Sequence, residues 1–180
     1  MPIQLPDQLP RAVRPVLGPV FEALTPQQAM TDLIVTRPRT GAAHEALAAA
    51  ADHPTLADHP AVRAAMWIYV DDLDAAHGPA QHLNTPAGSF LHAIVHRREG
   101  DFPNALYWYR KTGPHPVMSR IDLTGGGAGS GTEVAAYDPY RFVERVQKAS
   151  ENNDRANPAL VSIQNKEWRA LFAHLIEDLH

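Results

Sequence analysis

Two histidines and a glutamate stand at helical spacing in the segment GSFLHAIVHRREGDFPNALYWYRKTGPHP, residues 88–116. Residues three and four positions apart lie on the same side of a helix, with Cβ atoms about 5–6 Å apart. His92, His96 and Glu99 therefore share one ridge, at the edge of an apolar stripe and beyond it. Two imidazoles at this spacing can reach one divalent ion, so the ridge is a candidate metal site.

A second set of potential ligands lies just upstream. Asp74 and His77 are three residues apart, at the margin of the apolar face predicted for residues 59–77. If that helix packs antiparallel to the helix of residues 88–99, Asp74 and His77 oppose the two histidines of the ridge. The result is an inward-facing cluster of imidazole and carboxylate groups, which is a ligand set suited to zinc, iron or manganese.

A metal-dependent hydrolase of a small substrate is the leading prediction from this cluster. His92, His96, His77 and Asp74 would bind the metal, and Asp74 or Glu99 would act as general base. A metal with an open coordination position could activate water for hydrolysis. The sequence lacks HExxH and so carries no known protease signature.

A non-catalytic helical interaction module is the competing prediction. An HxxxH pair arises readily by chance in a chain with ten histidines, and a half-exposed histidine needs no ligand. In such a module His92 and His96 would hydrogen-bond to the hydroxyls of Tyr107 or Tyr109, and apolar grooves would bind a protein partner. The sequence leaves the partner open between a small molecule and a protein.

Two arginines follow the second histidine of the ridge. The helical wheel puts Arg98 on the apolar side, where a buried guanidinium requires a carboxylate such as Asp71 or Asp72, or an anionic ligand. The alternative is that the helix frays at this end, which leaves both Arg97 and Arg98 in solvent.

The composition excludes several classes of site and partner. The chain has 180 residues, of which 44% are hydrophobic and 20% charged, as in a globular domain with one core. It has no cysteine, which excludes disulfides, thiolate zinc sites and cysteine nucleophiles. A net charge of −4 without a long basic run argues against a nucleic-acid partner. No apolar run approaches the roughly 18 residues of a membrane span, and the first residues lack a secretory signal pattern, so we expect a cytoplasmic protein.

The elements that position these residues are all predicted to be helices, because no stretch alternates with period two. Prolines limit residues 1–40 to short helical pieces at 20–24 and 26–34, so we expect an irregular N-terminal wrap. Residues 41–180 are expected to form one helical domain, a compact bundle or array. Its predicted helices cover 42–51, 59–77 (interrupted by Gly78-Pro79, with a further turn or two to Leu83), 88–99, 103–112 and 138–149, with a last one after Pro158. The glycine-rich segment 125–131 lacks the lysine of a phosphate-binding loop and is predicted to be a mobile loop.

The hairpin resembles a known repeat. Gly100-Asp101-Phe102, followed by Ala105, by residues 107–111 and by Pro116, resembles the turn and second helix of a tetratricopeptide or Sel1-like repeat. One unit of roughly 30 residues matches, whereas stable arrays need about three or more. The resemblance implies that the first helix turns His92 and His96 toward its partner helix. In packing positions they must be hydrogen-bonded or ligated, because an unpaired buried polar group costs roughly 1–3 kcal/mol.

A longer resemblance covers most of residues 60–180. The segments DDLDAAHGPAQHL, YDPYRFVERV and IQNKEWRALFAHL, together with the hairpin, resemble a family of uncharacterised bacterial and fungal proteins. This resemblance implies one domain and no particular reaction.

Overall fold

The computed structural model describes residues 9–121, 123, 136–177 and 179 of the chain. Within these ranges it forms nine α-helices, one 3₁₀ helix and no strand, which confirms the predicted all-α class. The glycine-rich segment 125–131 lies outside the described residues. The helices are α1 (Arg14–Ala23), α2 (Ala42–Ala50), α3 (Pro54–Ala57), α4 (Pro60–Tyr69), α5 (Leu73–Gln81), α6 (Pro86–Glu99), α7 (Phe102–Thr112), η1 (Pro116–Arg120), α8 (Pro139–Glu151) and α9 (Pro158–Ile176).

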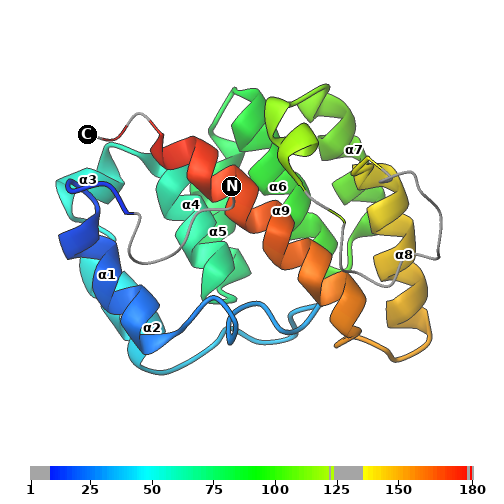
Figure 1. Cartoon of the computed structure of the whole chain (residues 1–180), viewed down its shortest axis with the longest axis horizontal. Coiled ribbons are helices and arrows are strands. Elements are labelled where there is room, and N and C mark those ends of the chain that lie inside the picture. The colour runs from blue at the N-terminus through cyan, green and yellow to red at the C-terminus, as the bar shows by residue number, and fades with distance from the viewer. Residues whose placement is uncertain (1–8, 122, 124–135, 178, 180) are drawn as a thin grey trace.

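Helix α6 lies in the middle of a compact bundle (Figure 1). Helices α4, α5 and α7 pack against it, and α9 runs diagonally across the bundle and contacts α4 and α8. Helices α1, α2 and α3 form one end of the molecule, and α8 forms the other end against α7. None of the helices in the described ranges combines the length and apolar character that a membrane span requires.

The sequence defines both ends of α6. The Thr85 hydroxyl accepts a hydrogen bond from the Gly88 amide at 3.0 Å, with Pro86 in the first turn. Gly100 ends the helix in the left-handed region, with φ of 85°. A Cβ atom at position 88 would lie 2.3 Å from the Leu83 Cβ, so only glycine allows α6 to start this close to the end of α5. Every residue from Gly88 to Arg98 is buried.

The prediction of one helix over residues 59–77 is wrong, because the chain turns between α4 and α5. Asp71 adopts a left-handed conformation with φ of 61°, which ends α4. The Asp72 carboxylate then accepts a hydrogen bond from the Ala75 amide at 3.0 Å and caps α5. The predicted interruption at Gly78-Pro79 is also wrong: α5 continues through Pro79 to Gln81, as the further turn predicted to reach Leu83 requires, and Ala76 and Ala80 are packed in the core. This shift places His77 in the middle of α5.

The first 40 residues also differ from the predicted helical pieces. The piece expected at 20–24 begins earlier, as α1, with Pro15 in its first turn and Pro19 inside it. The piece expected at 26–34 is absent, and Met30 within it is left-handed with φ of 52°. Residues 30–40, which we call the strap, instead lie across other elements. The Leu33 amide donates to the Arg155 carbonyl and the Val35 amide to the Arg98 carbonyl, both at 2.8 Å.

Candidate metal centre

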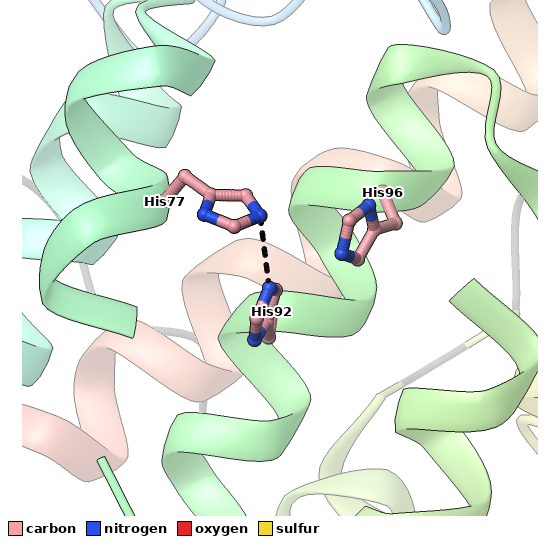
Figure 2. A group of neighbouring side chains, drawn as sticks. All are labelled: His77, His92 and His96. Carbon is pink, nitrogen blue, oxygen red and sulfur yellow. Dashed lines mark hydrogen bonds between the residues drawn. The ribbon is translucent and has the colours of Figure 1, made fainter. Parts of the chain in front are cut away.

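Three histidines from two helices converge on one point (Figure 2). His77 comes from α5, and His92 and His96 come from successive turns of α6. The ring nitrogens that could bind an ion all lie within 4.8 Å of one another. His77 and His92 are closest, with their Nε2 atoms 3.1 Å apart. Within the described ranges no other set of three histidine, cysteine or acidic side chains meets this distance.

The predicted acidic residues take two different places. Glu99, one turn after His96, accepts a hydrogen bond from the His96 Nδ1 at 2.9 Å. Asp74, one turn before His77, is exposed and is not among the three converging ligands. The structure therefore brings together His77, His92 and His96 with Glu99 behind them, and it leaves Asp74 at the rim.

The contact with Glu99 determines how His96 can act. A carboxylate that accepts the Nδ1 proton of a neutral imidazole leaves Nε2 with a free lone pair. Metal-binding histidines usually have such an outer partner, which fixes the tautomer and orients the ring. Only 7% of His96 is exposed to solvent. Packing against its neighbours therefore also holds the ring in this orientation.

His92 is the most deeply buried member of the group. Its ring stacks on the Trp108 ring of α7, with centroids 3.9 Å apart. Burial, together with the charges of His77, His96 and Lys111, lowers the pKa of His92 from 6.5 to about 4. The ring is therefore neutral at pH 7, which is the form that binds metals. Its Nδ1 atom is buried and has no hydrogen-bond partner among the described residues, which costs stability.

Arg98 fixes α6 against the helix that carries His77. Its guanidinium is fully buried, and it donates to the Ile68 carbonyl at 2.9 Å and to the Asp71 carboxylate at 2.7 Å. Ile68 lies in the last turn of α4 and Asp71 precedes α5, so these bonds hold the turn before α5 onto α6. Of the two predicted alternatives, burial against Asp71 is confirmed and fraying of the helix end is wrong.

Arg97 fixes the opposite side of α6. It makes two hydrogen bonds to the buried Glu167 carboxylate of α9, at 2.6 and 3.0 Å. The hydroxyls of Tyr109 and Tyr137 also donate to this carboxylate, Tyr109 at 2.6 Å. Helices α6, α7 and α9 and the segment before α8 thus meet at one buried ion pair, and the rotation of α6 about its axis is fixed.

Neither of the two tyrosine hydroxyls predicted to bind the histidines is a partner of them. The Tyr109 hydroxyl is bound to Glu167 and Arg97, and Tyr107 is 52% exposed. The predicted histidine–tyrosine hydrogen bonds are therefore wrong, and the histidines contact one another instead.

Sequence reasoning missed Glu167, although a signal was present. Ile163 and Leu171 lie one helical turn before and after it on the buried face of α9. A carboxylate in an apolar position of an amphipathic helix requires a buried cation, and Arg97 is that cation.

Comparison with known proteins finds no relative of this chain. No protein-family model, no curated protein and no solved structure matches this chain. The candidate function therefore depends on the chemistry of the three histidines and their surroundings.

Proposed function

We propose that this protein binds one divalent transition-metal ion, zinc in the first place, through His77, His92 and His96, and uses it to hydrolyse a small substrate. The observation that carries the proposal is the convergence of three imidazoles from α5 and α6. Imidazole is a ligand for zinc, iron and manganese, and the three rings supply the usual number of protein ligands in a catalytic zinc site.

The spacing of the ligands supports a tetrahedral ion. With zinc–nitrogen bonds of about 2.0–2.1 Å, two ligands of a tetrahedral site lie about 3.3 Å apart. The 3.1 Å between His77 Nε2 and His92 Nε2 is close to this value. The widest ligand spacing is 4.8 Å, so binding requires the rings to close by about 1.5 Å at most.

The fourth coordination position supports hydrolysis. No further protein ligand joins the three histidines within the described residues, so water can occupy that position. A zinc ion held by these three histidines would supply a bound water whose pKa is lowered to about 7. Glu99 and Asp74 line a cavity of about 160 Å³ beside the cluster. We assign the general base to this pair, Glu99 first because it already contacts a ligand.

The metal proposal is tested by titrating zinc into chelator-treated protein by calorimetry. The native chain is expected to bind one zinc per molecule, and His92→Ala/His96→Ala is expected to bind none. The matched control is His59→Ala/His82→Ala, which also removes two imidazoles, both exposed. Zinc binding that is equal in all three proteins, or absent from the native chain, overturns the metal site and favours the interaction module.

The hydrolase proposal needs a separate measurement. The zinc-loaded protein is assayed against chromogenic carboxylate and phosphate esters, with the metal-free protein and His92→Ala/His96→Ala as blanks. Hydrolysis that requires zinc and both histidines supports the proposal. Stoichiometric zinc without hydrolysis of either ester class overturns the hydrolytic part and leaves a non-catalytic metal site.

A further inference from the structure

A cleft lies between the strap and the turn that joins α4 to α5. Its volume is about 580 Å³, within the range of small-molecule sites of about 300–1,000 Å³. The strap forms one wall and is fixed by backbone hydrogen bonds to Arg98 at the end of α6 and to Arg155 between α8 and α9. Asp71, in the turn between α4 and α5, also lines the cleft. Because both walls are held by hydrogen bonds, the cleft is built into the fold.

Positive charge predominates in this cleft. Three arginines and two aspartates line it: Arg37, Arg39, Arg155, Asp32 and Asp71. Asp71 is already neutralised, since one carboxylate oxygen accepts from Arg98 and the other accepts from Arg39. The chain as a whole carries a net charge of −4, so the local excess of cations is opposite in sign to the rest of the molecule.

Two of these arginines are available to a ligand. Within the described residues, no carboxylate pairs with the guanidinium of Arg37 or Arg155, and both side chains are exposed. A guanidinium presents a planar fork of donors that matches the paired oxygens of a phosphate or a carboxylate. Arg37 and Arg155 come from distant parts of the chain and both line the cleft.

The cleft adjoins a smaller cavity that is lined by Glu99, the hydrogen-bond partner of His96. The smaller cavity that reaches Asp74 and Glu99 shares the strap residues 35–38 and Asp71 with the cleft. Glu99 in turn hydrogen-bonds to His96. Glu99 thus links the smaller cavity, which adjoins the arginine-lined cleft, to a proposed metal ligand.

We infer that this cleft binds the oxyanion group of a small molecule, a phosphate monoester or a carboxylate, through Arg37 and Arg155. That the bound molecule is the substrate of the metal centre rests on the proposed function. Binding of the oxyanion itself does not rest on it, since both arginines lie outside the histidine cluster. The pairing gives a substrate class: a small anion held at one end by guanidinium groups, with its reactive bond toward Glu99 and His96.

The test is a calorimetric titration of chelator-treated full-length protein with inorganic phosphate, and in parallel with malonate. The native chain is expected to bind one of these anions saturably, and more weakly as salt is raised. Arg37→Gln and Arg155→Gln are each expected to weaken binding about tenfold or more, because each removes a charged donor. Arg110→Gln, an exposed arginine of α7 that does not line the cleft, is the matched control and should bind as the native chain does.

His92→Ala/His96→Ala separates this inference from the proposed function. Phosphate or malonate binding that survives in this variant and is lost in Arg37→Gln supports the cleft even if no metal binds. Stronger binding of malonate than phosphate identifies a carboxylate ligand, and the reverse identifies a phosphate. Absence of saturable binding of both anions, equal binding by the arginine variants and the native chain, or loss of binding in the histidine variant overturns the inference.

Discussion

The Nε2 atoms of His77 and His92 lie 3.1 Å apart, although the two residues belong to different helices and are 15 positions apart in sequence. At this distance the Nε2–H of one ring donates a hydrogen bond to the Nε2 of the other when no ion is present. When that proton moves to Nδ1 of the same ring, both Nε2 lone pairs can be directed at one ion. The contact between α5 and α6 is therefore a hydrogen bond in the metal-free protein and a metal bridge in the proposed loaded form.

His77 is expected to contribute as much to metal binding as the two histidines of α6. His77→Ala removes the only ligand from α5, so the bridge between the helices is lost. We expect a fall in zinc affinity larger than the 10–100-fold typical of an outer-sphere partner. Competition with a chromogenic chelator measures it. His82→Ala removes an exposed imidazole just after α5 and should leave the affinity unchanged; a similar fall in both variants would contradict the assignment.

Glu99 is expected to strengthen metal binding without touching the ion. Glu99→Gln replaces the charged acceptor of the His96 Nδ1 proton with a neutral one. Outer-sphere partners of this kind contribute 10–100-fold to metal affinity, and we expect a loss in that range. The same competition assay detects it. Glu144→Gln on the exposed face of α8 is the control for the change in charge, and the idea fails if the two variants bind zinc equally.

Trp108 is expected to report metal binding. Its ring lies 3.9 Å from the His92 ring, whereas Trp168 is buried on α9 with its indole nitrogen bound to the Ala65 carbonyl. Cobalt bound at the histidines should therefore quench mainly Trp108. We expect Trp108→Phe to lose most of the cobalt-dependent fluorescence change and Trp67→Phe to retain it. The opposite ranking would place the ion elsewhere.

Asp71 is expected to be essential for stability. Asp71→Asn keeps a side chain that tolerates the left-handed backbone, so the substitution tests the charge. It leaves the fully buried Arg98 guanidinium without its carboxylate. Removing one partner of a buried ion pair costs roughly 3–5 kcal/mol, and we expect that loss in the free energy of unfolding measured with urea. Asp71→Asn/Arg98→Met removes both charges and should recover part of the lost free energy of unfolding. If none is recovered, the loss comes from the backbone at position 71 and not from the unpaired charge.

Alkaline pH is expected to destabilise the fold through Tyr109 and Tyr137. Burial, with the negative charge of Glu167, raises the pKa of each phenol well above its usual value of 10. The folded state therefore keeps protons that the unfolded chain releases above about pH 10, so the free energy of unfolding falls as pH rises past that value. Each such phenol contributes up to about 1.4 kcal/mol per pH unit to this slope.

The alkaline slope can be measured by urea unfolding at several pH values above and below about 10. Tyr137→Phe should reduce the slope even though it also lowers stability at neutral pH. Tyr107→Phe changes an exposed phenol and serves as the control. An unchanged slope in Tyr137→Phe would show that this phenol ionises freely in the folded protein.

The sequence predicts correctly those features that depend on the spacing within a single helix. The ridge of His92 and His96 follows from helical spacing alone, and so do the hairpin of α6 and α7 and its turn at Gly100. The position of His77 does not follow from helical spacing, because it depends on the residue at which α5 begins. That start is determined by the left-handed turn at Asp71, which in turn is stabilised by Arg98 from 27 residues further along the chain.

The position of the strap is even harder to predict from the sequence. Its sequence has no periodic pattern, and its place is determined by hydrogen bonds to Arg98, Arg155 and Gln164, which come from distant parts of the chain. The arginine-lined cleft exists only because the strap is placed there. No rule of local spacing could have brought Arg37 and Arg155 to one cavity.

The burial of α6 has a consequence for how this chain can vary. From Gly88 to Arg98 every position is buried, and the steric limit at Gly88 forbids any side chain there. Among these residues, Arg97 and Arg98 bind carboxylates on two different elements. A saturation library of the whole chain would therefore show its lowest mutational tolerance in this helix, and the two arginines would tolerate even fewer replacements than the apolar residues beside them. Sequence drift in this protein should accumulate in α2 and α8, which both have several exposed residues.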